Sequence, residues 1–277
     1  MVAGDMIPGY VAPFISTCTL KGYEPFRRRH CQGFSLTVRS LAMIIKNRLD
    51  NLDWPTIEQA LWDRGYAKTS PLLTPEECNK LIAFYRQDEK FRSRIDMARH
   101  RFGVGEYKYF ADPLPPLVQE LRTGMYPFLA PIANRWMEAL RIAEQFPATL
   151  SEFLSYCRGH GQTRPTPLLL SYETGGYNCL HQDLYGAVAF PLQLTFFLSQ
   201  RERDYTGGEF LLVEQRPRAQ SRGEAIATEQ GELVIFTTRY RPALGKRGYH
   251  RVQMRHGVST VTSGSRYTLG VIFHNAK

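Results

Sequence analysis

The sequence predicts an α+β fold in which a helical region precedes a β-rich core. Residues 53–160 show helical periodicity and helix-capping residues, whereas residues 161–277 contain short alternating stretches separated by turn residues. Of the 277 residues, 43% are hydrophobic, which is enough to bury a full core. We expect residues 53–160 to be a helical support region and residues 161–277 to be the catalytic core.

The first 52 residues differ from the rest of the chain. Residues 27–30 form a basic run, and no amphipathic period is sustained before Leu41. We interpret residues 1–52 as an accessory N-terminal extension. A poorly ordered tail and a nucleic-acid-binding arm are the two readings of this segment, and the tail is the simpler one.

Helix signals begin at Asp53, which can cap a helix that Gly65 would end. A second helix is predicted after Thr74, because Thr74 and Glu77 have the spacing of a capping box. Residues 115–157 are helical in pattern, and we expect the prolines in this stretch to break the helix. These prolines are Pro127, Pro131 and Pro147.

The second half of the chain has the strand pattern. The predicted strands are residues 166–173, 177–183, 190–198, 208–214, 225–228, 232–237, 254–261 and 267–274. So many short strands after a helical region favour a β core that is closed or sandwiched against helices.

Residues 177–186 contain the strongest chemical signal. His181 and Asp183 lie two apart in a predicted strand, so both side chains project from one face. One imidazole and one carboxylate are two of the three ligands in the 2-His-1-carboxylate triad, which binds non-haem Fe(II) and leaves positions open for substrate and O2. The sequence therefore predicts an iron site whose third ligand, a histidine, comes from another part of the chain.

His256 is the best candidate for that ligand. A hairpin turn at residues 262–265 would fold residues 267–274 back on residues 254–261, and pairing of Thr260 with Arg266 would put His256 and Arg266 on one side. Arginine offers a planar fork of donors for a carboxylate. We therefore expect Arg266 to bind the distal carboxylate of 2-oxoglutarate. Tyr172 and Asn178 are further candidates for binding this co-substrate, with core and turn support as the alternative.

The net charge of +9 and the pI near 9.4 favour polyanionic partners such as nucleic acid. Two groups of residues could bind phosphates or stack bases, although a solvated loop and a surface hairpin are equally good readings. These candidates are Arg216, Arg218 and Arg222 in one group, and Tyr107, Lys108 and Tyr109 in the other.

The five cysteines are an odd number without a CxxC pair, which favours a reducing, cytoplasmic compartment over a disulfide framework. No apolar run has the length of a membrane span, and we read no signal peptide, so we expect no membrane partner. Nothing in the sequence indicates an obligate protein partner.

Gly207 and Gly208 mark a tight turn that enters a predicted strand. Together, the metal-ligand candidates and this glycine turn resemble the Fe(II)/2-oxoglutarate-dependent dioxygenases, whose core is a double-stranded β-helix of the jelly-roll or cupin type. More narrowly, four motifs between about residues 52 and 276 resemble a bacterial branch that acts on damaged nucleic acid. The residues that carry these resemblances are His181, Asp183, Gly207-Gly208-Glu209-Phe210, His256 and Arg266, and the motifs are residues 161–170, 180–186, 214–222 and 255–259.

This resemblance implies a dioxygenase that uses Fe(II), 2-oxoglutarate and O2. On an alkylated DNA base, the reaction would remove a methyl group and release succinate, CO2 and formaldehyde. An alternative within the same superfamily is a protein side-chain hydroxylase of the prolyl type. A second alternative, from a different class, is a β-barrel that binds a metal without catalysis.

Overall fold

The computed structural model describes residues 38–277 except residue 217. These described residues form one compact unit. The unit contains the helices α1 (Val38–Asp50), α2 (Trp54–Arg64), α3 (Pro75–Phe84), α4 (Pro116–Ala139) and α5 (Leu150–Gly159). Its strands before the catalytic core are β1 (Tyr66–Lys68), β2 (Phe91–Asp96), β3 (Gly103–Val104) and β4 (Glu106–Phe110).

The core itself consists of strands β5 to β14. These are β5 (Leu168–Glu173), β6 (Tyr177–His181), β7 (Leu192–Phe197), β8 (Tyr205–Gly207), β9 (Phe210–Gln215), β10 (Arg222–Ile226), β11 (Leu233–Thr237), β12 (Tyr240–Gly245), β13 (Gly248–Val258) and β14 (Val261–Ile272). They belong to an 8-stranded sheet of order β1-β11-β7-β14-β5-β4-β2, to which β8 is added, and a 6-stranded sheet of order β10-β9-β13-β6-β3, to which β12 is added.

The chain crosses repeatedly between the two sheets. Strands β5, β7, β8, β11 and β14 lie in the 8-stranded sheet, whereas β6, the pair β9 and β10, and the pair β12 and β13 lie in the 6-stranded sheet. All strand pairs are antiparallel. This alternation is the winding of a double-stranded β-helix, so the predicted fold class is confirmed.

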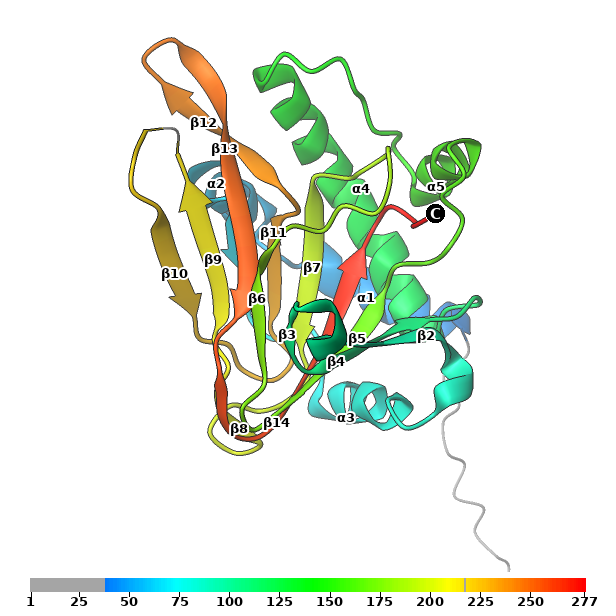
Figure 1. The fold of residues 1–277 in the computed structure, drawn as a ribbon. Coiled ribbons are helices and arrows are strands. Elements are labelled where there is room, and N and C mark those ends of the chain that lie inside the picture. Colours follow the sequence, from blue (N-terminus) through cyan, green and yellow to red (C-terminus); the bar gives the residue numbers. More distant parts are fainter. Residues whose placement is uncertain (1–37, 217) are drawn as a thin grey trace, which may run out of the picture. The chain divides into compact units, whose positions relative to one another are not determined.

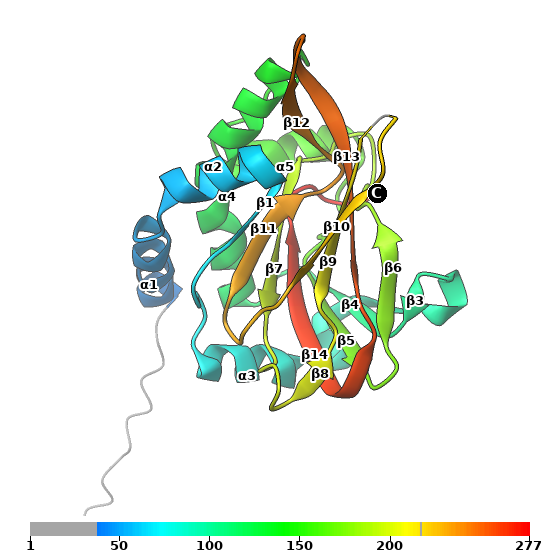
Figure 2. The same ribbon diagram turned by 90° about the vertical axis from the view of Figure 1, so that its left-hand side faces the viewer.

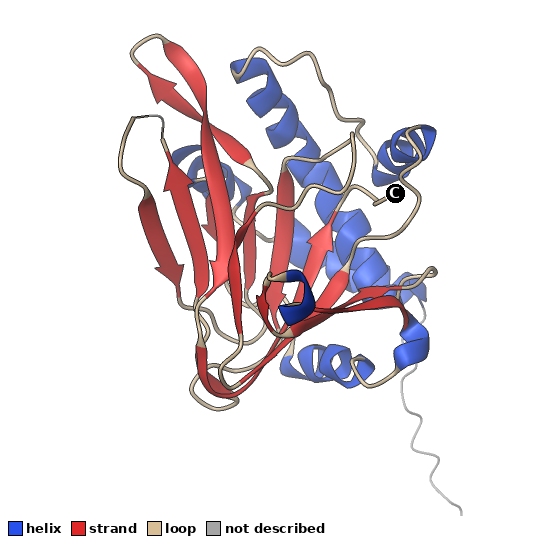
Figure 3. Ribbon diagram, in the orientation of Figure 1, coloured by secondary structure: helices blue, strands red, loops and turns tan. Residues whose placement is uncertain are grey.

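The helices cover the outer face of the 8-stranded sheet (Figures 1 and 2). Coloured by secondary structure, the unit shows strands on one side and α1, α4 and α5 on the other (Figure 3). One apolar cluster joins these helices to the sheet and includes Trp136, Leu194 and Val271. A second cluster lies between the sheets and includes Phe197 and Phe210.

Two helix starts follow the sequence signals. The Asp53 carboxylate accepts a hydrogen bond from the Thr56 backbone N–H, and Gly65 ends the same helix in a left-handed conformation. Thr74 and Glu77 form the predicted capping box, with each side chain accepting the other residue's backbone N–H. These local patterns predicted the ends of α2 and the beginning of α3.

The predicted breaks at Pro127 and Pro131 were wrong, because α4 runs through both prolines. A proline leaves the carbonyl four residues earlier without a donor, so the free carbonyls belong to Thr123 and Pro127. Thr123, Pro127 and Pro131 are all exposed and lie four residues apart on one face of the helix. Water can therefore satisfy these carbonyls, and the helix continues.

The domain boundaries differ from those predicted. Residues 38–50 form a helix in which Ile45 and Leu49 are buried against the core, so the last part of the expected extension belongs to the folded unit. Residues 1–37 lie outside the described residues. The expected helical region also supplies strands β1 to β4, and the predicted strands included neither β8 nor β12.

Cys78, Cys157 and Cys179 are free thiols. Cys18 and Cys31 lie outside the described residues. Within residues 38–277, no helix combines the length and apolar character needed to span a bilayer.

A buried histidine predicts a loss of stability in acid. His274 is fully buried, and its Nδ1 accepts a hydrogen bond from the Phe190 backbone N–H. Burial lowers the pKa of His274 to about 4. Because the unfolded chain binds a proton near pH 6.5 and the folded chain does not, this group's stabilisation is present above pH 6.5 and is lost as the pH falls towards 4.

The His274→Asn variant keeps an acceptor for the Phe190 N–H. We expect the free energy of unfolding to fall between pH 7 and pH 5 by about 2 kcal/mol less in this variant than in the parent. Urea unfolding of the metal-free protein at both pH values measures the difference. The exposed His160→Asn variant is the control. Equal pH dependence in the parent and His274→Asn would contradict the prediction.

Candidate metal centre

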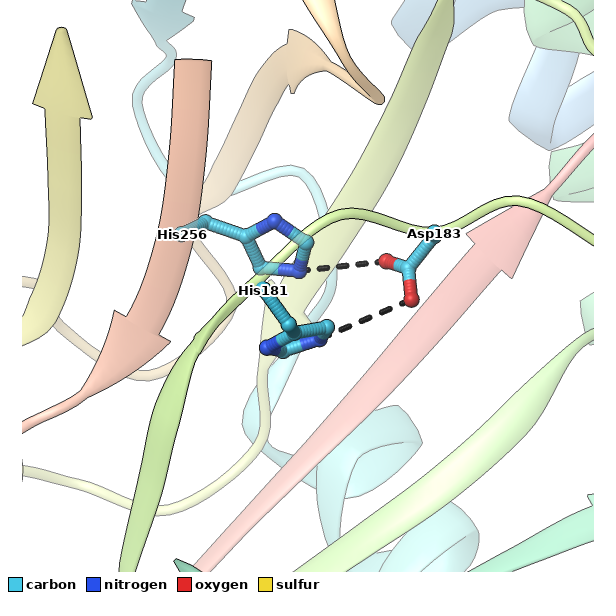
Figure 4. A group of neighbouring side chains, drawn as sticks. All are labelled: His181, Asp183 and His256. Atoms are coloured by element: carbon cyan, nitrogen blue, oxygen red, sulfur yellow. Dashed lines mark ion pairs between the residues drawn. The ribbon is translucent and has the colours of Figure 1, made fainter. Parts of the chain in front are cut away.

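His181, Asp183 and His256 meet at one point, although they come from separate segments (Figure 4). His181 ends β6, Asp183 follows in the next loop, and His256 lies on β13 directly opposite His181 in the strand pairing. One ligand atom from each residue lies within 4.8 Å of the others. The structure thus brings the three predicted ligands together.

The contacts fit a common ion. His256 Nε2 lies 3.1 Å from one Asp183 carboxylate oxygen, and His181 Nε2 lies 3.5 Å from the other. Ligand atoms bound to one ion at about 2.1 Å lie roughly 3 Å apart. His181 Nδ1 lies 2.8 Å from the Cys179 carbonyl, to which it can donate, leaving Nε2 as the atom that faces Asp183. The set of two imidazoles and one carboxylate suits Fe(II).

The three groups shift one another's pKa values. Burial raises the pKa of Asp183, but the two histidines outweigh it and hold the Asp183 pKa well below its usual range. Burial lowers the pKa of His181, and hydrogen bonding to Asp183 overcomes this and raises it. Burial and the neighbouring His181 lower the pKa of His256. The carboxylate is therefore ionised and ready to bind a cation at neutral pH.

Tyr185 holds Asp183 in place, a role that the sequence did not reveal. Its hydroxyl donates a 2.9 Å hydrogen bond to Asp183 Oδ1. Burial, together with the nearby Asp183 charge, raises the pKa of Tyr185, so this hydroxyl remains a donor. Spacing was the available signal, since Tyr185 lies two residues after Asp183.

We expect Tyr185→Phe to weaken Fe(II) binding by about 10- to 100-fold, the usual effect of removing a hydrogen bond to a metal ligand. Anaerobic Fe(II) titration measures the affinity. The control is Tyr156→Phe, which alters an exposed tyrosine. An unchanged Fe(II) affinity in Tyr185→Phe would show that packing alone positions Asp183.

Gln162 fixes the loop that carries Asp183. Its Nε2 donates to the carbonyls of Val188 and Asn275, and its Oε1 accepts from the Val188 N–H. A Cβ on Gly186 would lie 2.4 Å from Gln162, so only glycine fits there without displacement. This contact joins the two motifs, residues 161–170 and 180–186, in the fold.

A cavity of about 80 Å³ lies beside the triad and reaches Arg266. One water molecule needs roughly 10–15 Å³ of such space, so a small molecule fits. The cavity lies between the two sheets. Its polar lining consists of Tyr107, Tyr172, Asn178, Asp183, Tyr185, Gln193, Thr195, His256, Arg266 and Thr268.

Arg266 is 1% exposed, yet its three guanidinium nitrogens have no hydrogen-bond partner among the described residues. Three aromatic rings lie beside its charge, at 5.5 Å for Tyr172 and for Phe197 and 5.9 Å for Tyr205. A buried charge without a partner is costly. An anionic ligand in the cavity would supply the missing acceptor, and the distal carboxylate of 2-oxoglutarate fits this requirement.

The predicted route to this arrangement was wrong. Arg266 pairs with Tyr172 on β5 and not with Thr260, and residues 262–265 belong to β14. Strands β13 and β14 lie in different sheets. His256 and Arg266 therefore line one cavity because they face each other across the space between the sheets.

Tyr172 and Asn178 both line the cavity, as expected for co-substrate ligands. Asn178 Nδ2 donates to the Tyr172 hydroxyl over 3.2 Å. The proton of that hydroxyl remains available to a ligand. Burial raises the pKa of Tyr172, which keeps the proton in place at neutral pH.

The glycine turn makes room for Arg266. Gly207 and Gly208 both have positive φ, and a Cβ on Gly208 would lie 2.9 Å from Arg266 Cδ. We expect Gly208→Ala to raise the KM for 2-oxoglutarate about tenfold, because the new methyl group displaces the arginine, and steady-state succinate formation measures this KM.

The matched control for this prediction is Gly175→Ala. Gly175 also has positive φ, but nothing lies within 4 Å of its Cβ position. Both substitutions carry the strain of a left-handed alanine, about 1–2 kcal/mol, and only one touches Arg266. Equal KM values in the two variants would contradict the role given to Gly208.

The predicted nucleic-acid residues are distributed unevenly. Tyr107 lines the cavity, but Lys108 is 5% exposed and donates to Asp88 and the Tyr85 carbonyl, so its assignment to phosphate binding was wrong. Tyr109 is buried. Arg216, Arg218 and Arg222 lie at the exposed end of the β9–β10 hairpin; Arg216 forms an ion pair with Glu214, and Arg222 forms one with Glu224.

Residues 105–276 match the family model Oxygenase-NA, described as "Oxygenase, catalysing oxidative methylation of damaged DNA". Uncharacterised proteins from two strains of Mycobacterium tuberculosis are each 51% identical to the chain over 167 residues, which cover 60% of this chain and 72% of theirs.

Among solved structures, a Pseudomonas putida prolyl-4-hydroxylase is similar at a TM-score of 0.47 and 12% identity, covering 81% of this chain and 99% of that chain. A 2OG-Fe(II) oxygenase family oxidoreductase from Burkholderia pseudomallei is similar at a TM-score of 0.46 and 12% identity, covering 82% of this chain and 93% of that chain.

Proposed function

Because this chain belongs to the Oxygenase-NA family, we propose that it oxidatively removes alkyl groups from bases in damaged DNA. The enzyme class expected from the sequence, an Fe(II)/2-oxoglutarate-dependent dioxygenase, is confirmed by the family match together with the His-Asp-His triad. The alternative of a non-catalytic metal-binding barrel is thereby excluded. The DNA substrate and a cytoplasmic location belong to the proposal.

The observation that carries the proposal is the cavity with the triad at one end and, at the other, a buried Arg266 that has no hydrogen-bond partner in the described part of the chain. His181, Asp183 and His256 would hold Fe(II). Arg266 would bind the distal carboxylate of 2-oxoglutarate, and Tyr172 and Asn178 would donate hydrogen bonds to it. These assignments give an acceptor to Arg266, whose guanidinium lies beside the cavity without a hydrogen-bond partner among the described residues.

Bound Fe(II) and 2-oxoglutarate supply the oxidising chemistry, in which O2 and the co-substrate give succinate, CO2 and one oxygen atom for a C–H bond. The protein's own residues position the reactants. The Asp183 carboxylate and the two histidines hold the metal on one side, and Tyr185 and Gln162 keep the Asp183 loop fixed. Apolar residues, including Leu168 and Phe236, form the rest of the cavity lining.

Oxygen transfer to an N-methyl group on a base gives an N-hydroxymethyl group. Its C–N bond then breaks, the nitrogen takes the hydroxyl proton, and formaldehyde leaves. The oxygen is added to the methyl carbon, and that carbon then leaves the base as formaldehyde. We therefore propose that the oxidation removes a methyl group from the base. No protein base is needed for the C–N cleavage.

The test is anaerobic reconstitution with Fe(II) and 2-oxoglutarate, followed by exposure to air with a methylated or an unmethylated DNA oligonucleotide. We expect formaldehyde only with the methylated strand, and none with His181→Ala. Succinate without formaldehyde on any methylated strand would overturn the DNA substrate and favour the prolyl-type alternative. Absence of both products, with no iron bound, would overturn the triad.

A further inference from the structure

The hairpin formed by β12 and the first part of β13 is strongly basic. Residues 239–255 contain six Lys or Arg residues and no Asp or Glu. Antiparallel pairing from Tyr240 with Gln253 to Gly245 with Gly248 makes this segment a two-stranded ribbon. Its tip projects beyond the neighbouring strands (Figures 1 and 2). The basic residues are Arg239, Arg241, Lys246, Arg247, Arg251 and Arg255.

Most of this charge is not neutralised within the described chain. Arg241 is buried and forms an ion pair with Glu214. The other basic residues of the hairpin are exposed, and no carboxylate of residues 38–277 lies within 4.0 Å of their charged nitrogens. By contrast, Arg216 and Arg222 on the β9–β10 hairpin each have a glutamate partner. The β12–β13 hairpin therefore offers the freer charges.

Aromatic rings accompany the charges. The guanidinium of Arg251 lies 5.1 Å from the centre of the Tyr240 ring, and that of Arg239 lies 5.9 Å from it. Tyr249 is 45% exposed. The half-buried Tyr240 ring beside two guanidinium groups and the exposed Tyr249 ring suit a nucleic acid better than an acidic peptide, because bases can stack while phosphates pair with the cations.

The base of the hairpin is joined to the metal segment. Gln182, which lies between two ligands, donates through Nε2 to the Arg239 carbonyl, the Met254 carbonyl and the Gln253 side chain. A second cavity, of about 140 Å³, is bordered by Arg239, Tyr240 and Leu184, the residue after Asp183. A nucleic-acid strand bound to the hairpin would therefore pass beside the metal centre.

We propose that the β12–β13 hairpin holds the sugar-phosphate backbone of the nucleic-acid substrate. Lys246, Arg247 and Arg251 pair with phosphates, and Tyr240 and Tyr249 offer stacking surfaces. This proposal rests on the proposed function for the class of substrate. It goes further by assigning the binding surface to a hairpin that the sequence-based candidates did not include.

The test measures binding of a fluorescent single-stranded oligonucleotide by anisotropy over a range of salt concentrations. The variant Lys246→Ala/Arg247→Ala/Arg251→Ala removes three hairpin charges, and Lys80→Ala/Arg86→Ala/Arg158→Ala removes three exposed charges elsewhere. We expect the hairpin variant to bind at least about tenfold more weakly than the control at low salt. Its salt slope should fall by about 2, since each single-strand phosphate contact contributes roughly 0.7.

Succinate formation without DNA should be equal in both variants, which shows that the metal and co-substrate sites are intact. If the parent binds and demethylates DNA and the hairpin variant matches the control, the hairpin proposal is overturned and the proposed function stands. If the parent binds no DNA, both are overturned. Equally tight binding of a polyglutamate peptide by the parent, lost in the hairpin variant, would reassign the surface to an acidic protein partner.

Discussion

Asp183→Asn abolishes Fe(II) binding at micromolar concentrations and reduces succinate formation by about 10³-fold or more. The substitution keeps the shape of the side chain but removes the negative charge that both histidines face. The loss of Fe(II) affinity should exceed the 10- to 100-fold loss that is typical when a residue that only supports a metal ligand is replaced. Metal content after anaerobic loading and succinate formation measure the two effects.

The control for this prediction is Asp63→Asn, which changes an exposed carboxylate that accepts a hydrogen bond from Gln59. That variant should bind iron normally. An Asp183→Asn protein that retains one equivalent of tightly bound Fe(II) would show that the two histidines suffice, and Asp183 would then not be a ligand.

Arg266→Met raises the stability of the metal-free protein by about 1–3 kcal/mol while removing its response to 2-oxoglutarate. The gain is expected because methionine removes a buried charge that has no hydrogen-bond partner among the described residues. The lost contacts with three aromatic rings offset only part of this gain. The loss of response is expected because the co-substrate's carboxylate then has no cation.

Thermal unfolding with and without 2-oxoglutarate, in the presence of a redox-inert divalent ion, measures both effects. At a concentration of 100 times Kd, the ligand should stabilise the parent by about 2.7 kcal/mol and the variant by almost nothing. A stabilisation of Arg266→Met equal to that of the parent would place the carboxylate elsewhere.

Arg122→Met provides the matched control. Arg122 is also buried, at 2% exposure, but it donates hydrogen bonds to the Ile272 and Phe273 carbonyls and to Asn275. Its removal takes a donor from each of these acceptors and should cost about 2–4 kcal/mol. Two buried arginines should therefore respond to the same substitution with opposite signs, and destabilisation by both would show that Arg266 serves the apo fold.

Local sequence patterns predicted the local structure well. The capping residues Asp53 and Thr74 depend on neighbours within a few positions, and the structure places both as expected. His181 and Asp183 come together as expected, but Asp183 lies in the loop after β6 and not in the strand that the spacing predicted. Patterns that depend on distant neighbours were less reliable. Lys108 reads as a surface residue, yet Asp88 and the Tyr85 carbonyl, both twenty or more positions away, bury its charge.

The approach of His256 to Arg266 was predicted correctly for the wrong reason. Hairpin pairing of adjacent strands is the simplest reading of a turn, and no local signal shows that the chain crosses from one sheet to the other between them. Tyr185 and Gln162 could not be assigned for a similar reason. Their partners depend on the path of the loop between β6 and β7, which the sequence leaves open.

The triad histidines lie on strands of one sheet and Arg266 on a strand of the other. The separation between the metal and the guanidinium is therefore set by the packing of two sheets, about 10 Å apart in general, and not by a flexible loop. Because this separation is rigid, only a diacid of matching length can reach both the metal and the guanidinium. The site should consequently discriminate against 2-oxo diacids that are one methylene shorter or longer, since neither could bind at both ends without moving a sheet.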